Sequence, residues 1–165
     1  MSAAAEKNSI GGGDGWSRSR LFLVFAAITV VALCESYTVL AGSQSIPYHV
    51  LFLLGGPGSK GDYVNVEVPG AYIGRKDEHV TLSKRIGCVA GDTLTFKNRA
   101  HFCNGEFLGR VLDRTHDGRW LKPFVWNGPV PAGKVFIVGT HERSWDSRYF
   151  GFVDAAKTER LKPLF

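Results

Sequence analysis

The side chains that could do chemistry gather in three stretches of this 165-residue chain. They read GSQSIPYHVLFL over residues 42–53, LSKRIGCVAGDTL over residues 82–94 and VGTHERSWDSRYFGFV over residues 138–153. The first supplies serines, the second a lysine, and the third a serine beside an Asp-Ser-Arg cluster. The sequence has five scattered histidines, no paired carboxylates and no plausible Ser-His-Asp order. Residue types alone therefore give a list of candidates, and a lysine could activate a serine only if it were neutral.

Each of the three stretches also has a simpler structural explanation. A Ser-x-Pro sequence after a helix is commonly an exit turn, and a lysine in a strand is commonly solvated. The Asp-Ser-Arg cluster could be an exposed turn with a surface ion pair, which contributes little to stability. None of the three stretches, taken alone, identifies a catalyst.

The order of the three stretches resembles the type I signal peptidase family of serine proteases. It is most similar to the conjugal-transfer branch, the TraF-type pilin maturation peptidases. KRIGCVAGD is similar to the family's Lys-Arg-x-x-x-x-x-Gly-Asp block, and SWDSRYFGFV to its Ser-x-Asp-Ser-Arg-Tyr-aromatic-Gly block. KGDYVNV resembles the family's Gly-Asp-x-Val strand, and VPAGKVFIVG the segment before the last block. The resemblance runs from the N-terminal apolar segment to about residue 153.

The resemblance implies a role for each matching position. Ser45 matches the nucleophile and Lys84 the general base, whose pKa must fall from ~10.4 through apolar burial. Ser144 matches the hydroxyl that orients the lysine amine. Ser43 matches the side chain that joins the Ser45 backbone N–H in an oxyanion hole. These residues would form a Ser-Lys variant of the catalytic triad.

Other matching positions imply support for the site. Asp146 and Arg148 match the family's structural ion pair, which would hold Ser144 against the lysine. Ser147 lies between them and would support the same turn. Asp92 matches the Gly-Asp turn and is expected to be structural. We expect no cofactor and no metal site.

The sequence departs from the common family pattern in two places. Pro47 follows Ser45 by two residues and Ile46 stands between them, where housekeeping signal peptidases have Met and a later Pro. This Ser-x-Pro form suits the conjugal branch, and it leaves open whether Ser43 or Ser45 attacks, with Ser45 preferred. The usual Gly-Asp-Asn-Arg opening of the last block is replaced by GTHER, so His141 is new and most simply a solvated loop residue.

An N-terminal helix would tether these residues. Residues 1–20 are small, polar and Gly-rich, and we expect a flexible cytoplasmic tail. Residues 21–42 form an apolar run of the length that crosses a bilayer as a helix. A buried core helix or a cleavable signal peptide is the alternative. We favour an uncleaved anchor in the bacterial inner membrane. Basic residues precede the segment, so the N-terminus would be cytoplasmic and residues 43–165 periplasmic.

The pattern after residue 42 predicts a mainly antiparallel β domain of the signal-peptidase type. Residues 63–68 alternate between polar side chains and valine, the period of a half-buried strand. GDTLTF and KVFIVG also predict strands, and Asn104-Gly105 suits a tight hairpin turn. No later segment shows a convincing helical stripe.

Cysteine content and charge narrow the remaining possibilities. Cys88 and Cys103 lie in the part predicted to be external, where a disulfide could form; two free thiols in a strand pair are the alternative. The net charge of +5 comes from basic residues interspersed with acids, which gives no nucleic-acid signal. We expect the partners to be membrane lipid and a precursor protein in extended form.

Four functions are compatible with these residues. The first is a membrane-anchored endopeptidase that cleaves a precursor through an acyl-enzyme on Ser45, with a conjugative pilin as the expected client. The second uses the same acyl-enzyme to close the pilin head to tail. The third is a non-catalytic envelope component of a transfer apparatus, since a fold does not guarantee activity. The fourth, a general signal peptidase, is disfavoured by the small size and the Ser-x-Pro form.

Overall fold

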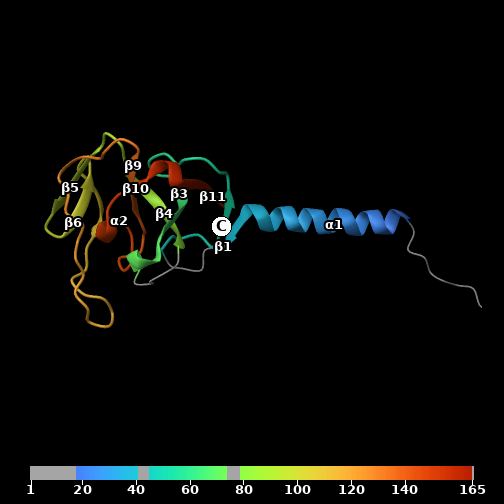
Figure 1. Ribbon diagram of the computed structural model, residues 1–165, viewed down its shortest axis with the longest axis horizontal. Coiled ribbons are helices and arrows are strands. Elements are labelled where there is room, and N and C mark those ends of the chain that lie inside the picture. Colours follow the sequence, from blue (N-terminus) through green and yellow to red (C-terminus); the bar gives the residue numbers. More distant parts are fainter. Residues whose placement is uncertain (1–17, 41–44, 74–78, 165) are drawn as a thin grey trace, which may run out of the picture. The chain divides into compact units, whose positions relative to one another are not determined.

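The computed structural model describes residues 18–40, 45–73 and 79–164, and of these it leaves the side chains of residues 34–36, 40 and 73 undescribed. The chain divides into two compact units, residues 1–36 and 37–165. Figure 1 shows one long helix, α1, and a β-rich unit made of short strands.

The expected N-terminal helix is α1, Arg18–Tyr37. It begins before the predicted residue 21, so Arg18 and Arg20 are helical and not part of a tail. It ends before the predicted residue 42, because the β-branched Thr38 and Val39 pair with a neighbouring strand instead. Within the described residues, no helix combines the length and the apolar character that crossing a membrane requires. The anchor is therefore a prediction that the structure does not confirm.

The larger sheet carries the candidate lysine. Its seven strands run in the order β1-β2-β11-β3-β4-β9-β10, and all of their pairings are antiparallel. In chain order the bounds are β1 Thr38–Leu40, β2 Val50–Leu53, β3 Tyr63–Pro69, β4 His79–Val89, β9 Lys134–Val138, β10 Val153–Asp154 and β11 Thr158–Pro163.

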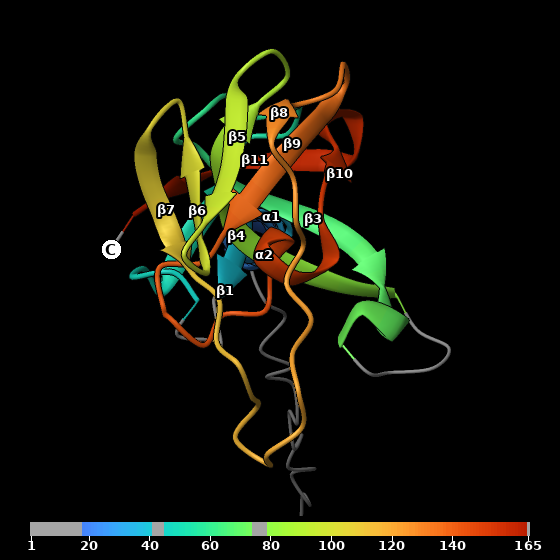
Figure 2. The ribbon, with the colours of Figure 1, turned by 90° about the vertical axis from the view of Figure 1, so that its left-hand side faces the viewer.

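The smaller sheet has four strands in the order β7-β6-β5-β8. They are β5 Thr93–Lys97, β6 Ala100–Cys103, β7 Glu106–Arg110 and β8 Gly128–Pro129. Figure 2 shows β5, β6 and β7 side by side, and the long loop between β7 and β8 extending away from the strands. Asn104 and Gly105, both with positive φ, make the predicted tight turn between β6 and β7.

Buried side chains form a core on each side of β4. One cluster contains Val64, Val66, Val68 and Ile86, so the predicted alternation in β3 is confirmed. The other cluster contains Cys88, Leu94, Leu108 and Phe136, among others. The change of side along β4 occurs at Gly87, where the β4–β9 register shifts. A Cβ there would lie 3.1 Å from Leu108, so the close packing favours glycine.

The mainly antiparallel β architecture is confirmed, but some helical structure follows residue 42. The helix α2, Ser147–Phe150, lies inside the SWDSRYFG stretch, and the 3₁₀ turns η1, Gly70–Ile73, and η2, Ala155–Lys157, flank strands. These segments are too short to produce a helical stripe in the sequence. The Asp146 carboxylate caps α2 by accepting the Arg148 N–H.

Candidate active site

Lys84 lies on β4 with its side chain buried. Val64 of β3 is its register partner, and only 3% of the lysine is exposed. Burial lowers the pKa of Lys84 from 10.5 to about 8; Asp146 opposes this shift and Arg148 adds to it. A substantial fraction of Lys84 is therefore neutral in mildly alkaline solution, as a general base requires.

One serine contacts this amine, and a second serine lies next to the first. Lys84 Nζ donates to Ser144 Oγ over 2.9 Å, and Ser144 Oγ lies 3.5 Å from Ser45 Oγ. The second distance is long for a hydrogen bond between hydroxyls, and such contacts often tighten only when substrate binds. The structure thus brings together the predicted nucleophile, base and orienting hydroxyl from three separate parts of the chain.

The end of β9 fixes the backbone of Ser45. The carbonyl oxygen of Ser45 accepts the Thr140 N–H over 2.8 Å and the Thr140 hydroxyl over 3.2 Å. A Cβ on Gly139 would lie 2.0 Å from Ser144 Oγ and 3.0 Å from the Ser45 oxygen. Position 139 must therefore be glycine for the two serines to approach. Sequence reasoning did not identify Thr140 or Gly139, because the roles of both depend on the position of the distant Ser45 backbone.

Ile46, the residue after the proposed nucleophile, is anchored in the hydrophobic core. It is 3% exposed and packs with Leu51 and Leu161 in a small third core cluster. The serine thus lies between a buried neighbour on one side and the Thr140 contacts on the other. Both reduce the freedom of Ser45 before any substrate binds.

Asp146 and Arg148 form a buried bidentate ion pair. Arg148 Nε and a terminal nitrogen each donate to the Asp146 carboxylate over 2.8 Å. The same guanidinium donates to the Ser144 carbonyl over 3.1 Å, and Asp146 accepts the Gly139 N–H over 2.8 Å. The pair therefore ties the Ser144 turn to the end of β9.

The other predicted support residues also have structural contacts. Ser147 is fully buried, and its hydroxyl accepts the Ile137 N–H of β9 over 3.0 Å. The Asp92 carboxylate accepts the Val89 N–H over 3.1 Å and the Asn104 amide over 2.7 Å. Asp92 thus closes the turn between β4 and β5, away from the serines. The predicted oxyanion residue Ser43 lies outside the described residues.

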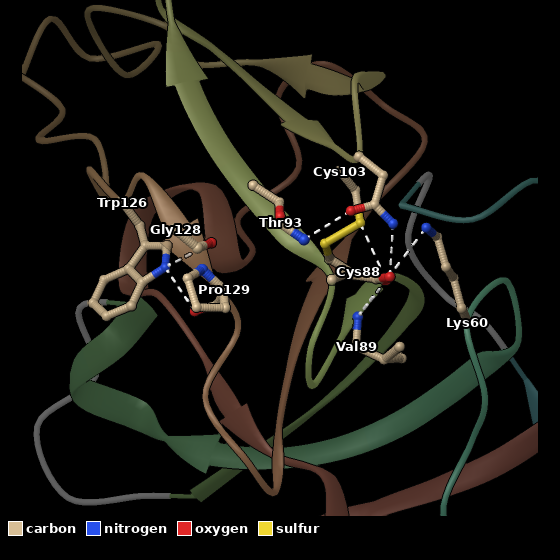
Figure 3. Close-up of a disulfide and its surroundings, with 10 residues drawn as sticks. Lys60, Cys88, Val89, Thr93, Cys103, Trp126, Gly128 and Pro129 are labelled. Atoms are coloured by element: carbon tan, nitrogen blue, oxygen red, sulfur yellow. Dashed lines mark hydrogen bonds and ion pairs between the residues drawn. A yellow bond between two sulfur atoms is a disulfide. The ribbon is translucent and has the colours of Figure 1, made fainter.

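A disulfide joins Cys88 of β4 to Cys103 of β6, with their Cα atoms 5.7 Å apart. Figure 3 shows this bond with Val89 and Lys60 near it. The Val89 N–H donates to the Asp92 carboxylate over 3.1 Å, and the Lys60 amine lies 3.3 Å from it. Cys88, Asp92 and Cys103 have the spacing of a metal site, since their ligand atoms lie within 4.8 Å of one another. Both sulfur atoms are used in the disulfide, so no thiolate remains for a metal there.

Comparisons with known proteins identify a family for this chain. The family described as "Signal peptidase, peptidase S26" matches residues 16–159. A signal peptidase I of Bacillus caldolyticus is 32% identical over 90 residues, which cover 48% of this chain and 48% of that protein. The chain thus spans about half the length of this curated relative. A crystal structure of a signal peptidase I from Enterococcus faecalis is 23% identical with a TM-score of 0.37, covering 67% of this chain and 100% of that one.

A match over most of the chain establishes the family: this protein belongs to the signal peptidases, peptidase family S26. The residues described above, from Ser45 to Ser147, lie within the matched range.

Proposed function

We propose that the chain is a serine endopeptidase in which Lys84 activates Ser45. One observation carries this proposal: a buried lysine with a pKa lowered to about 8 contacts Ser144, which in turn contacts Ser45. An ordinary solvated lysine would be protonated at neutral pH and could not accept a proton. The three side chains have the order and the environment that a Ser-Lys peptidase needs.

The reaction needs only these residues, the substrate and water. Neutral Lys84 accepts the Ser45 hydroxyl proton while Oγ forms a bond to the substrate carbonyl carbon. The C–N bond breaks, the leaving amine receives the proton from Lys84, and an ester joins the acyl group to Ser45. Water, deprotonated by Lys84, then cleaves the ester and restores the serine. Ser144 acts as a positioning residue for the lysine amine.

The substrate would lie as an extended segment along β4. Strand β9 pairs with β4 only from Arg85 to Val89, so residues 79–84 have β3 as their one strand partner in the described part of the chain. The free edge of these residues ends at Lys84 and can accept another strand by hydrogen bonding. An exported precursor would fit this requirement, because the segment near its processing site is extended.

The finer assignments rest on the resemblance to the conjugal branch. In this proposal the client is a conjugative pilin precursor, and the enzyme is anchored in the cytoplasmic membrane with the β unit outside. The exposed apolar side chains of α1 support the anchor, since Phe22 and Phe25 are 71% and 67% exposed. In an anchored enzyme these exposed rings would contact lipid.

The intact mass of a co-expressed pilin precursor tests this function. We expect a shortened product with the wild-type chain, and full-length precursor with Ser45→Ala or Lys84→Ala. Ser59→Ala and Lys134→Ala change an exposed serine and a surface lysine and are the matched controls. A product lighter by a further water would show that the acyl group passes to the pilin's own amine. Processing that survives both active-site changes would favour the non-catalytic envelope component.

A further inference from the structure

An aromatic groove is lined in part by Trp145, the residue that follows Ser144. It has a volume of about 440 Å³ and comes from three separate segments of the chain. Its main lining residues are Tyr72, Thr115, Arg119, Trp120, Leu121 and Trp145. None of them belongs to the Ser-Lys site, but Trp145 directly follows Ser144.

The aromatic rings of the groove are held in place from behind. Trp145 stacks on Tyr149 with ring centroids 4.5 Å apart, and Tyr72 stacks on Phe150 at 5.1 Å. Both partners belong to α2. The helix that follows the Ser144 turn therefore also supports two walls of the groove.

The third ring, Trp120, is presented by an ordered loop. Trp120 pairs with Arg114 as an isolated β-bridge, and the Thr115 N–H donates to the Arg119 carbonyl over 2.9 Å. The Arg114 guanidinium lies 3.9 Å from the Trp120 ring centroid. Even so, Trp120 is 72% exposed. An exposed tryptophan does not contribute to the hydrophobic core. Because the loop around Trp120 is ordered and the ring lines a groove, we interpret this ring as part of a binding surface.

The charges of the groove favour an uncharged occupant. Arg119 is the one charged residue among the described lining residues, and it already pairs with Asp117 over 2.7 Å. The remaining surface is aromatic ring, Leu121 and small side chains. Among the described lining residues, an acidic or phosphorylated group would find no unpaired cation, whereas a planar or branched apolar side chain would cover the rings.

Two lining residues of the groove lie close in sequence to the two ends of the proposed substrate-binding edge of β4. A segment along the free edge of β4 runs between Lys84 and His79. At the far end, His79 pairs with Pro69, and Tyr72 follows Pro69 by three residues. At the near end, Trp145 follows the serine that contacts Lys84. Tyr72 is thus linked through the chain to the His79 end of this edge, and Trp145 to the Lys84 end.

We propose that the groove binds an aromatic or branched apolar side chain of the precursor, at a position away from the bond that is cut. This inference rests on the proposed peptidase function, because it assigns the groove to the substrate of that site. Trp120 is the residue that determines this preference. The groove makes cleavage depend on a distant residue as well as on the residues at the scissile bond.

A peptide ladder tests the inference. The probe is an alanine-rich peptide with small residues at the scissile bond and a single Phe moved one position at a time away from it. We expect kcat/KM of the wild-type chain to peak at one register, about threefold to tenfold above the peptide without Phe, the range of an aromatic contact. Trp120→Ala should abolish the peak. Val125→Ala removes an exposed apolar side chain of the β7–β8 loop that does not line the groove, and should keep it.

Binding measurements separate this inference from the proposed function. If wild-type chain cleaves no peptide, the peptidase assignment fails, and calorimetry with uncleaved peptides still tests the groove. The Ser45→Ala variant should then bind the best Phe peptide more tightly than the alanine peptide, and the added Trp120→Ala change should remove the difference. A peak that persists in Trp120→Ala, or no register preference, would overturn the inference. The inference would also be overturned if Trp120→Ala weakened binding to phospholipid vesicles but kept the peptide peak, because Trp120 would then contact lipid and not the precursor.

Discussion

Lys84 and Ser144 are sixty residues apart in the chain, yet the lysine amine donates to the serine hydroxyl over 2.9 Å. The contact forms because β4 and the turn after β9 meet on one face of the larger sheet, at the end where β9 pairs with β4. The same contact fixes the amine in a site that disfavours its charge. The same packing of β4 against the turn after β9 therefore both positions the proposed base and lowers its pKa.

The pH dependence of cleavage should report the ionisation of Lys84. The pKa of about 8 means that the lysine is protonated, and unable to accept a proton, in acidic solution. We expect kcat/KM to rise about tenfold per pH unit on the acidic side and to level off above a midpoint near the lysine pKa. Stopped assays with one peptide across buffers of constant ionic strength measure this profile.

Lys84→Arg provides the control for that profile. Its guanidinium stays protonated throughout the accessible range, so the variant should be inactive at every pH. A wild-type profile that is flat through the midpoint would contradict the assignment of Lys84 as the base.

Asp146→Asn should strongly destabilise the protein. The substitution leaves Arg148, which is 2% exposed, buried without its counter-charge. Loss of one partner of a buried ion pair costs about 3–5 kcal/mol. Urea unfolding at neutral pH measures the difference. Asp154→Asn is the matched control, since it breaks an exposed ion pair with Lys134 and should change stability little. Equal effects from the two variants would contradict a supporting role for Asp146.

Local pattern predicted the strands that carry the site but not all of its contacts. Alternation around Val64 and Val66 is a property of neighbouring residues, so the buried face of β3 could be read directly. The position of Lys84 opposite Ser144 followed only from the family resemblance, because periodicity does not encode contacts between distant segments. Thr140 was missed for the same reason, as its role depends on the backbone of Ser45.

The boundaries of the N-terminal helix also could not be predicted from the sequence. Composition predicted one apolar run to residue 42, but strand pairing of Thr38 and Val39 with β2 ends the helix earlier. The aromatic groove was also invisible in the sequence, since Tyr72, Trp120 and Trp145 have no common spacing. Both features depend on tertiary contacts that override local preference.

Gly139→Ala should impair catalysis more than folding. The added Cβ would overlap Ser144 Oγ at 2.0 Å and crowd the Ser45 carbonyl. The serines must then move apart, and a displacement on this scale costs on the order of a hundredfold in rate. We expect kcat to fall while KM changes little, because the strand edge for substrate remains. A variant that keeps wild-type kcat would show that the serine contact is not needed for the reaction.

Removal of the Cys88–Cys103 disulfide should lower stability without removing the site. The bond closes a loop with a sequence separation of 15, for which the loss is about 3 kcal/mol. The Cys88→Ala/Cys103→Ala variant should unfold at lower urea concentration than the oxidised protein. Added reductant should bring the wild-type protein to the same midpoint and leave the variant unchanged. A variant as stable as the oxidised protein would show that the two sheets are held together by packing alone.

His101 should make the protein less stable in mild acid. Its ring is fully buried, and Nε2 donates to the Phe124 carbonyl over 2.7 Å, so Nδ1 is the unprotonated nitrogen. Among the residues that the structure describes, Nδ1 has no hydrogen-bond partner. Burial lowers the pKa of His101; the Phe124 contact and Asp146 oppose this shift, and Arg148 adds to it. The unfolded chain therefore binds a proton below about pH 6.5 that the folded chain does not bind, and stability falls by up to about 1.4 kcal/mol per pH unit.

Urea unfolding of His101→Gln below and above the histidine pKa tests this linkage. The variant should be less stable than wild type at neutral pH, since glutamine does not replace the ring that packs against Phe96 and Phe136, but its stability should change less as the pH falls. His116→Gln replaces an exposed histidine of the β7–β8 loop and should keep the wild-type pH dependence. An unchanged slope in His101→Gln would mean that other groups cause the acid sensitivity. The difference between the two slopes, and not the absolute stability, isolates the buried imidazole, because it cancels every titration that the variants share.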